Sequence, residues 1–252
     1  MPLAIVPVAL FGLVIGSFLN VVAHRLPDRR SLVRPRSACP SCAAPVKPYD
    51  NVPVLSWLVL RGRCRSCAAP ISARYPVVEA GTAVLWAAVA AVHHADATRL
   101  ALGLVLVTVL VPLALIDFDR QILPNRITYP AFVGGFALGF ALDPAGEPGR
   151  LLAAAIAGGA FTLVVLLAPR GMGLGDAKLL AVLGVYLGAP VAVAVAVALV
   201  SGTAVGAFIV ARVGVTAGRK TAVPFGVFLA LGGVVAVLAG DPLVEWYLST
   251  LG

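Results

Sequence analysis

Residues 151–168, LLAAAIAGGAFTLVVLLA, form an uninterrupted apolar run that is long enough to cross a bilayer as a helix. Residues 171–179, GMGLGDAKL, follow closely, and residues 179–189, LLAVLGVYLGA, are apolar again. Charged side chains beside membrane-spanning sequence are costly, which makes Asp176 and Lys178 candidate functional residues. Their function depends on which other segments of the chain lie beside them.

The composition of the whole chain indicates a polytopic membrane protein. Its 252 residues are 60% hydrophobic and 12% charged, whereas a soluble domain has about 25% charged residues. Apolar windows predict an all-α fold with about eight transmembrane helices. They lie near residues 3–23, 78–95, 100–117, 127–142, 151–169, 177–189, 191–211 and 222–240.

Three segments at the margins of this pattern need separate expectations. We expect the first apolar stretch to be retained as a span, because no small-residue cleavage site follows it. Only Gly188-Ala189-Pro190 separates the sixth and seventh windows, so these form either two helices or one broken helix. Residues 241–250 contain Trp246 and Tyr247 and are predicted to lie at the membrane interface.

The basic residues gather in alternate connections between the predicted spans. Seventeen of the nineteen Lys and Arg residues fall in segments 24–77, 118–126, 170–178 and 212–221. By the positive-inside rule these segments face the cytoplasm and the N-terminus lies outside. Because the charges follow the loops and form no single patch, the net charge of +8 indicates topology and not nucleic-acid binding.

The long cytoplasmic loop, residues 24–77, contains all four cysteines of the chain. They form two Cys-x-x-Cys pairs, Cys39 with Cys42 and Cys64 with Cys67, which is a typical pattern for four-thiolate zinc binding. The alternatives are free buried cysteines and a redox pair. A cytoplasmic loop of this size builds little core and rarely holds structural disulfides, so a zinc ion is the expected stabiliser. With four cysteine ligands, the zinc would have no open position for chemistry.

Three carboxylates from two distant segments are predicted at one membrane depth. Asp117 and Asp119 lie where the third span meets the cytoplasm, and Asp176 lies at the start of the sixth span on the same side. Two carboxylates held close together share a proton, so one activates water while the other protonates a peptide bond. This is the chemistry of aspartic proteases. Residues two apart on a helix point about 200° apart, so only one of Asp117 and Asp119 can pair with Asp176, and spacing does not choose between them.

Two other functions use the same residues differently. Asp117-Phe118-Asp119 is an Asp-x-Asp pair, which can hold a divalent metal in a membrane glycosyl- or phosphotransferase. Intramembrane acids with helices broken by Gly and Pro also occur in transporters. Against a transporter, the charged sites lie at one edge of the membrane and no inverted repeat is visible.

Five segments in order resemble the bacterial type IV prepilin peptidases, a family of GxGD aspartic proteases. They are GSFLNVVAHRLP (16–27), the cysteine-containing stretch 39–79, IDFDRQILPN (116–125), GMGLGDAKL (171–179) and KTAVPFGVFLALGG (220–233). The last motif usually reads PFGPF, and Val227 replaces its second proline here. We expect that replacement to affect local helix entry and not chemistry.

The resemblance implies a site and two activities. It maps the catalytic pair to Asp117 and Asp176 and leaves Asp119 as a neighbour. It implies cleavage of prepilin and pseudopilin leaders at the cytoplasmic face of the bacterial inner membrane. It also implies methylation of the new N-terminus with S-adenosylmethionine, whose binding residues the sequence does not identify. Asp50, Asn51, Arg74, Tyr75 and Glu79 are polar positions in the matching stretches. For them, loop packing and a methyl-donor or substrate role both remain open.

The predicted organisation follows from these assignments. Residues 1–23 form the first transmembrane helix, residues 24–77 form the zinc loop associated with methyl transfer, and residues 78–252 form a seven-helix peptidase core with an interfacial tail. The expected partners are prepilins and the lipid bilayer. The sequence does not predict an oligomeric state.

Overall fold

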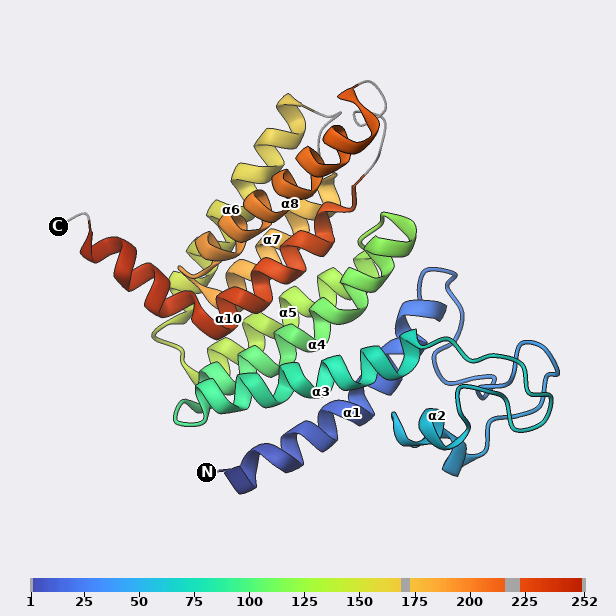
Figure 1. Ribbon diagram of the computed structural model, residues 1–252. Coiled ribbons are helices and arrows are strands. Elements are labelled where there is room, and N and C mark those ends of the chain that lie inside the picture. The colour runs from blue at the N-terminus through green and yellow to red at the C-terminus, as the bar shows by residue number, and fades with distance from the viewer. Residues whose placement is uncertain (1, 169–172, 216–222, 251–252) are drawn as a thin grey trace. The chain divides into compact units, whose positions relative to one another are not determined.

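The computed structural model describes residues 2–168, 173–215 and 223–250 of the chain (Figure 1). Within these ranges the regular structure is helical, and the only strand-like pairings are two isolated bridges, Ala38 with Pro45 and Arg63 with Pro70. The chain divides into two compact units, Met1–Val92 and His93–Gly252. The sequence instead predicts a boundary at residue 78, between the zinc loop and the peptidase core. That boundary differs from this division and remains a prediction.

The first unit consists of two long helices and the cysteine loop between them. Its elements are α1 (Pro2–Arg25), the short helices η1 (Pro48–Asn51) and α2 (Leu55–Val59), and α3 (Arg74–His93), whose last residue falls in the second unit. The backbones of α1 and α3 approach closely at two glycines. A Cβ atom at Gly12 would lie 2.9 Å from Ala83 Cα, and one at Gly16 would lie 2.8 Å from Glu79 Cα. Glycines four residues apart on α1 therefore form its contact with α3.

The second unit is a helical bundle built around a short central helix. Its helices are α4 (Ala97–Arg120), α5 (Asn125–Leu142), α6 (Glu147–Leu167), α7 (Leu174–Leu187), α8 (Val191–Val213) and α10 (Phe225–Ser249). Helix α7 packs against α4, α5, α6, α8 and α10, and eight of its fourteen residues are buried. The start of α7, where Asp176 lies, is thereby fixed relative to several neighbouring helices.

The all-α polytopic fold predicted from the sequence is confirmed. In the part of the chain that the structure describes, six helices are long and apolar enough to cross a membrane: α1, α3, α4, α6, α8 and α10. Helices α5 and α7 coincide with the other two predicted spans, so the count of eight is approximate. With fourteen residues, α7 is about 21 Å long, which is shorter than the bilayer core of about 30 Å.

The segment on both sides of Gly188 and the predicted interfacial tail are both helical. Helices α7 and α8 are separate, because the chain turns at Gly188, which has φ +67°. The predicted interfacial tail continues α10 through Pro242 to Ser249, and Figure 1 shows the last part of α10 turning away from the bundle. Proline inside a helix accounts for such a bend. Trp246 and Tyr247 are exposed there, as expected for interfacial aromatic residues.

The contact between α6 and α7 leads to a stability prediction. Gly184 of α7 faces the backbone of Ala154 on α6, and a Cβ atom there would overlap the Ala154 Cα atom. We expect Gly184→Ala to destabilise the protein by about 2 kcal/mol, which lowers Tm in detergent by about 4–8 °C. Gly159→Ala on α6 is the matched control, because no atom lies within 4 Å of its Cβ position. An unchanged Tm for Gly184→Ala would contradict this packing.

Candidate active site

Asp117 lies near the C-terminal end of α4 and is only 5% exposed. The amide N–H of Val227, in the first turn of α10, donates to its Oδ2 atom over 3.2 Å. Asp119 is exposed on the same helix, as expected for residues that project about 200° apart. Asp117 therefore points into the unit and Asp119 does not, an arrangement that does not favour a chelating Asp-x-Asp pair.

Asp176 is the third residue of α7 and is partly buried. Its Oδ2 atom accepts a hydrogen bond of 3.2 Å from the amide of Gly173, and its own amide donates to the Gly173 carbonyl over 3.1 Å. This reciprocal pairing caps the helix and fixes the direction of the carboxylate.

Leu123 lies where the two acidic segments meet. A Cβ atom at Gly175 would lie 3.2 Å from Leu123 Cβ, and one at Gly226 would lie 3.1 Å from Leu123 Cδ2. The side chain of Leu123 thus fills the space between the starts of α7 and α10, next to Asp117. Three segments that are far apart in the sequence converge on the acidic pair.

Glycine permits left-handed backbone angles and close approach of other groups, so the glycines before Asp176 could serve either purpose. Gly173 has φ −95°, and Gly175 is not among the glycines with positive φ, so neither adopts a left-handed conformation. Close approach does apply at Gly175, where Leu123 occupies the space of a side chain. Gly171 lies outside the described residues.

The four cysteines form one cluster in the loop of the first unit. Their Sγ atoms all lie within 4.8 Å of one another, with 3.8 Å between Cys39 and Cys67 and 4.0 Å between Cys42 and Cys64. Each Cys-x-x-Cys pair has the same turn: the amide of Cys39 donates to Ala44 O over 2.9 Å, and that of Cys64 donates to Ala69 O over 2.8 Å. All four thiols are free.

This cluster has the dimensions of a tetrahedral zinc site. Zinc–sulfur bonds of about 2.3 Å in tetrahedral geometry place the sulfur atoms about 3.8 Å apart, close to the spacings in the cluster. Backbone amides of Cys42 and Ser41 donate to the Cys39 sulfur and lower the pKa of this thiol to about 6. A thiolate is the form that binds metal. The cluster is therefore compatible with structural zinc.

Several polar side chains in and beside the loop form contacts that stabilise the loop. Arg65 binds Asp50 through two nitrogens, with Nη2 to Oδ1 at 2.6 Å, and this hydrogen-bonded partner lowers the pKa of the Asp50 carboxyl. Buried Glu79 accepts a 2.7 Å hydrogen bond from the amide of Val54, and Asn20 donates to the Tyr75 carbonyl over 3.2 Å. For Asp50 and Glu79 these contacts support the packing interpretation over methyl-donor binding.

Comparison with known proteins identifies the family. Residues 10–93 match the bacterial peptidase A24 N-terminal domain, and residues 104–211 match the type IV leader peptidase family. A prepilin leader peptidase/N-methyltransferase of Aeromonas salmonicida is 40% identical over 97% of this chain and 94% of its own length. The chain belongs to the type IV leader peptidase family.

Other relatives of the same name agree with this membership. The protein of Aeromonas hydrophila is 41% identical over 96% of this chain and 93% of its own length. That of Pseudomonas aeruginosa is 35% identical over the same fractions of the two chains. No solved structure gives a significant match to the chain.

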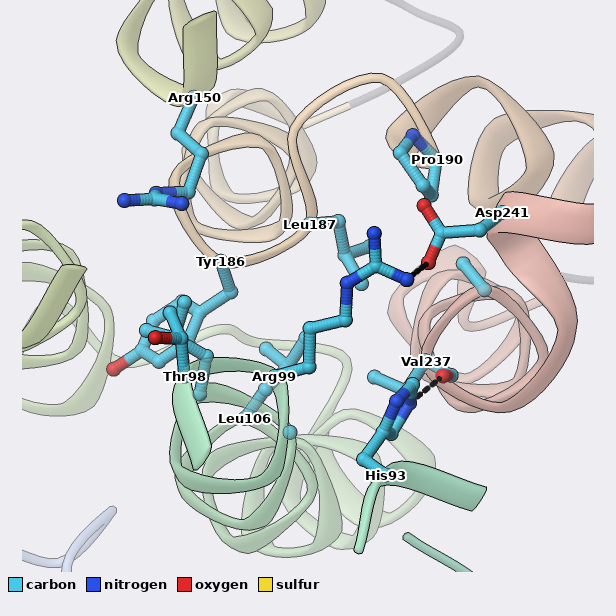
Figure 2. A pocket seen from close by; sticks show the side chains of 13 residues that line it. His93, Thr98, Arg99, Leu106, Arg150, Tyr186, Leu187, Pro190, Val237 and Asp241 are labelled. Atoms are coloured by element: carbon cyan, nitrogen blue, oxygen red, sulfur yellow. Dashed lines mark hydrogen bonds and ion pairs between the residues drawn. The ribbon is translucent and has the colours of Figure 1, made fainter. Parts of the chain in front are cut away.

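A cavity of about 150 Å³ lies in the second unit beside the start of α4, and Figure 2 shows the side chains that line it. It is lined by Arg99, in the first turn of α4, which reaches Asp241 of α10 over 2.7 Å. His93 beside it bonds to the Val237 carbonyl over 2.7 Å. Arg99 precedes Asp117 by eighteen residues on one helix, or about 27 Å. The cavity is therefore too far from Asp117 to receive a peptide bond for cleavage there.

Sequence reasoning missed the contribution of α10 to the candidate site around Asp117. Gly226 and the amide of Val227 both contact Asp117, but backbone donors leave no signature in side-chain chemistry. The available signal was the Pro-Phe-Gly stretch at 224–226, which was interpreted only as a motif of the resemblance. The expectation that Val227 affects only helix entry did not anticipate its hydrogen bond.

Lys178 connects the two acidic motifs at their edge. Its Nζ donates to Asn125 Oδ1 over 3.0 Å and lies 5.2 Å from the centre of the Tyr129 ring. From the sequence, Lys178 is a candidate functional residue because of its position beside membrane-spanning sequence. Because the contact is exposed, we expect Lys178→Met to lower the rate of leader cleavage less than about tenfold. Initial rates decide this: a loss as large as that of Asp176→Ala would make Lys178 catalytic.

Proposed function

We propose that this membrane enzyme removes the leader peptide of prepilins through a catalytic pair formed by Asp117 and Asp176. The observation that carries the proposal is the convergence of these two carboxylates from α4 and α7. Asp117 is buried beside Gly226, and Leu123 lies next to both Gly226 and Gly175, the residue before Asp176. The names of the relatives support the substrate, since they are prepilin leader peptidases.

The two carboxylates would share the steps of hydrolysis. Carboxylates held close together do not both ionise, so one is charged and the other protonated. The charged carboxylate takes a proton from water, whose oxygen attacks the peptide carbonyl, while the protonated carboxyl donates to the carbonyl oxygen. When the tetrahedral intermediate collapses, the C–N bond breaks and the amine leaves with a proton. This cycle consumes one water and needs no metal.

We further propose that the chain methylates the new N-terminus, as the names of its relatives indicate for those proteins. In that transfer the amine nitrogen would bond to the methyl carbon of S-adenosylmethionine as the S–CH3 bond breaks. S-adenosylhomocysteine would leave, and the amine would lose one proton. Cys39, Cys42, Cys64 and Cys67 would hold a zinc ion that stabilises the loop. Four thiolates leave the zinc no open position, so its role is structural.

The proposed orientation follows from the charge distribution. The segments that hold Asp117, Asp176 and the cysteines are those rich in Lys and Arg, so they would face the cytoplasm of a bacterial inner membrane. The N-terminus would then lie outside. A reporter that is active only in the cytoplasm, fused after residue 250, tests the orientation of the C-terminal tail.

Intact mass of a prepilin tests the two activities together. The full-length chain in detergent is mixed with a prepilin that carries a basic leader, with and without S-adenosylmethionine. We expect loss of the leader in both reactions and a gain of one methyl group only with the donor. A prepilin that keeps its leader in both would overturn the proposal. Cleavage that stops with a chelator but persists in cysteine variants would favour a metal-dependent site at the aspartates.

A further inference from the structure

Asp117 is contacted by the first turn of α10, which has no part in the hydrolysis steps proposed above. The first turn of α10 begins at Phe225, and its third residue, Val227, lies 110 positions away from Asp117 in the sequence. Its amide nevertheless donates to Asp117 Oδ2 over 3.2 Å. Amides in the first turn of a helix have no partner within that helix and favour a negative group beside them.

Gly226 makes this approach possible. A Cβ atom at position 226 would lie 2.8 Å from Asp117 Oδ2 and 3.0 Å from its Cγ. The carboxylate therefore packs directly on the bare backbone of the helix start. Any side chain at this position must displace the carboxylate, because the end of a side chain moves more easily than the backbone of two packed helices.

We propose that the first turn of α10 positions Asp117 for peptide cleavage through the side-chain-free Gly226. In this chain the amide of Val227, where the family motif usually has a proline without an N–H, adds a hydrogen bond. This inference rests on the proposed catalytic role of Asp117. One face of the carboxylate is fixed by the hydrogen bond and by contact with Gly226, so the other oxygen is directed to the rest of the site. Gly226 and Val227 are thus positioning residues, since they act on substrate only through Asp117.

Gly226→Ala tests the inference most directly. We expect kcat for leader cleavage to fall about 100-fold, because a displacement near 1 Å at a catalytic group has that effect, while KM changes less than about twofold. Gly206→Ala is the matched control, because no atom lies within 4 Å of its Cβ position. Methyl transfer to a prepilin whose leader is already removed, together with Tm, reports whether the variant is folded. A folded Gly226→Ala enzyme with kcat within about threefold of the parent, or with a change in KM alone, overturns the inference.

Comparison of two variants at position 227 tests the amide of Val227 separately. It also tests the positioning of Asp117 by α10 if Gly226→Ala does not fold. Val227→Pro removes the N–H and suits the first turn of a helix, whereas Val227→Ala keeps the N–H. We expect kcat of the proline variant to be about three- to tenfold below that of the alanine variant. Equal kcat values overturn the role of the amide.

The same experiments separate failure of this inference from failure of the proposed function. If Asp117→Ala abolishes cleavage and the variants at 226 and 227 do not lower kcat, the catalytic pair stands and the positioning role is wrong. If Asp117→Ala still cleaves the leader, the proposed function of Asp117 is wrong and the positioning role fails with it.

Discussion

Replacing Asp117 or Asp176 with alanine is expected to lower kcat/KM for leader cleavage by at least about 1000-fold. Each carboxylate carries part of the proton transfer, and general acid–base groups contribute about 10²- to 10⁴-fold. Neither neighbour can substitute, because Asp119 is exposed and Lys178 contacts Asn125. The measurement is the initial rate of leader loss by intact mass, with enzyme in detergent and substrate below KM.

Asp119→Ala is the control for this prediction. It removes a carboxylate two residues from Asp117 on the same helix, and we expect its rate to stay within about threefold of the parent. Methyl transfer to a substrate without a leader should persist in all three variants, which shows that they are folded. Full loss in Asp119→Ala with activity retained in Asp117→Ala would reverse the assignment of the pair.

Replacing Cys42 or Cys67 with serine is expected to remove the zinc and abolish methyl transfer. Structural zinc contributes apparent binding energies of about 10–16 kcal/mol in small metal-binding domains, and segment 24–77 has little other core. Both cysteines are exposed, which is consistent with a loop that has little hydrophobic core of its own. Zinc per chain, measured by elemental analysis, should fall from one to a small fraction. Leader cleavage should remain within about threefold of the parent, since Asp117 and Asp176 belong to the other compact unit.

Ser41→Ala is the matched control within the same turn. Its backbone amide still donates to the Cys39 sulfur, so zinc content and methyl transfer should be retained. Parallel loss of cleavage and zinc in Cys42→Ser would mean that the loop also serves the peptidase. Intact methyl transfer in a chain without zinc would contradict the role assigned to the cysteines.

Most of the fold could be predicted from hydrophobicity. The enclosed position of the short helix α7 could not, for a physical reason. Within the described residues every predicted span coincides with a helix, because a run of apolar residues in a bilayer must satisfy its backbone hydrogen bonds internally. Hydropathy does not distinguish a helix that faces lipid from one that is enclosed by other helices. Helix α7 is apolar enough to count as a span, yet it is short and eight of its residues are buried in the second unit.

The site was only partly predictable from the sequence. The charge pattern placed Asp117 and Asp176 on one side of the membrane, and the repeated Cys-x-x-Cys spacing predicted the thiol cluster. The choice between Asp117 and Asp119 required either the resemblance or the direction of α4, because helical spacing alone permits both. The contact of Asp117 with α10 was not predictable, because it depends on a backbone amide and on the absence of a side chain at Gly226.

The central claim is that Asp117 and Asp176 act together on one tetrahedral intermediate. The most direct test is binding of a prepilin peptide in which a hydroxyethylene group replaces the cleaved amide, compared with the same peptide lacking the hydroxyl. We predict that the hydroxyl tightens Kd at least about 100-fold for the parent and for Asp119→Ala, since analogues of this state bind much more tightly than ground-state ligands. The gain should disappear in Asp117→Ala and in Asp176→Ala. Equal affinity of the two peptides for the parent enzyme, or a gain that survives in either of those variants, would contradict a shared catalytic pair.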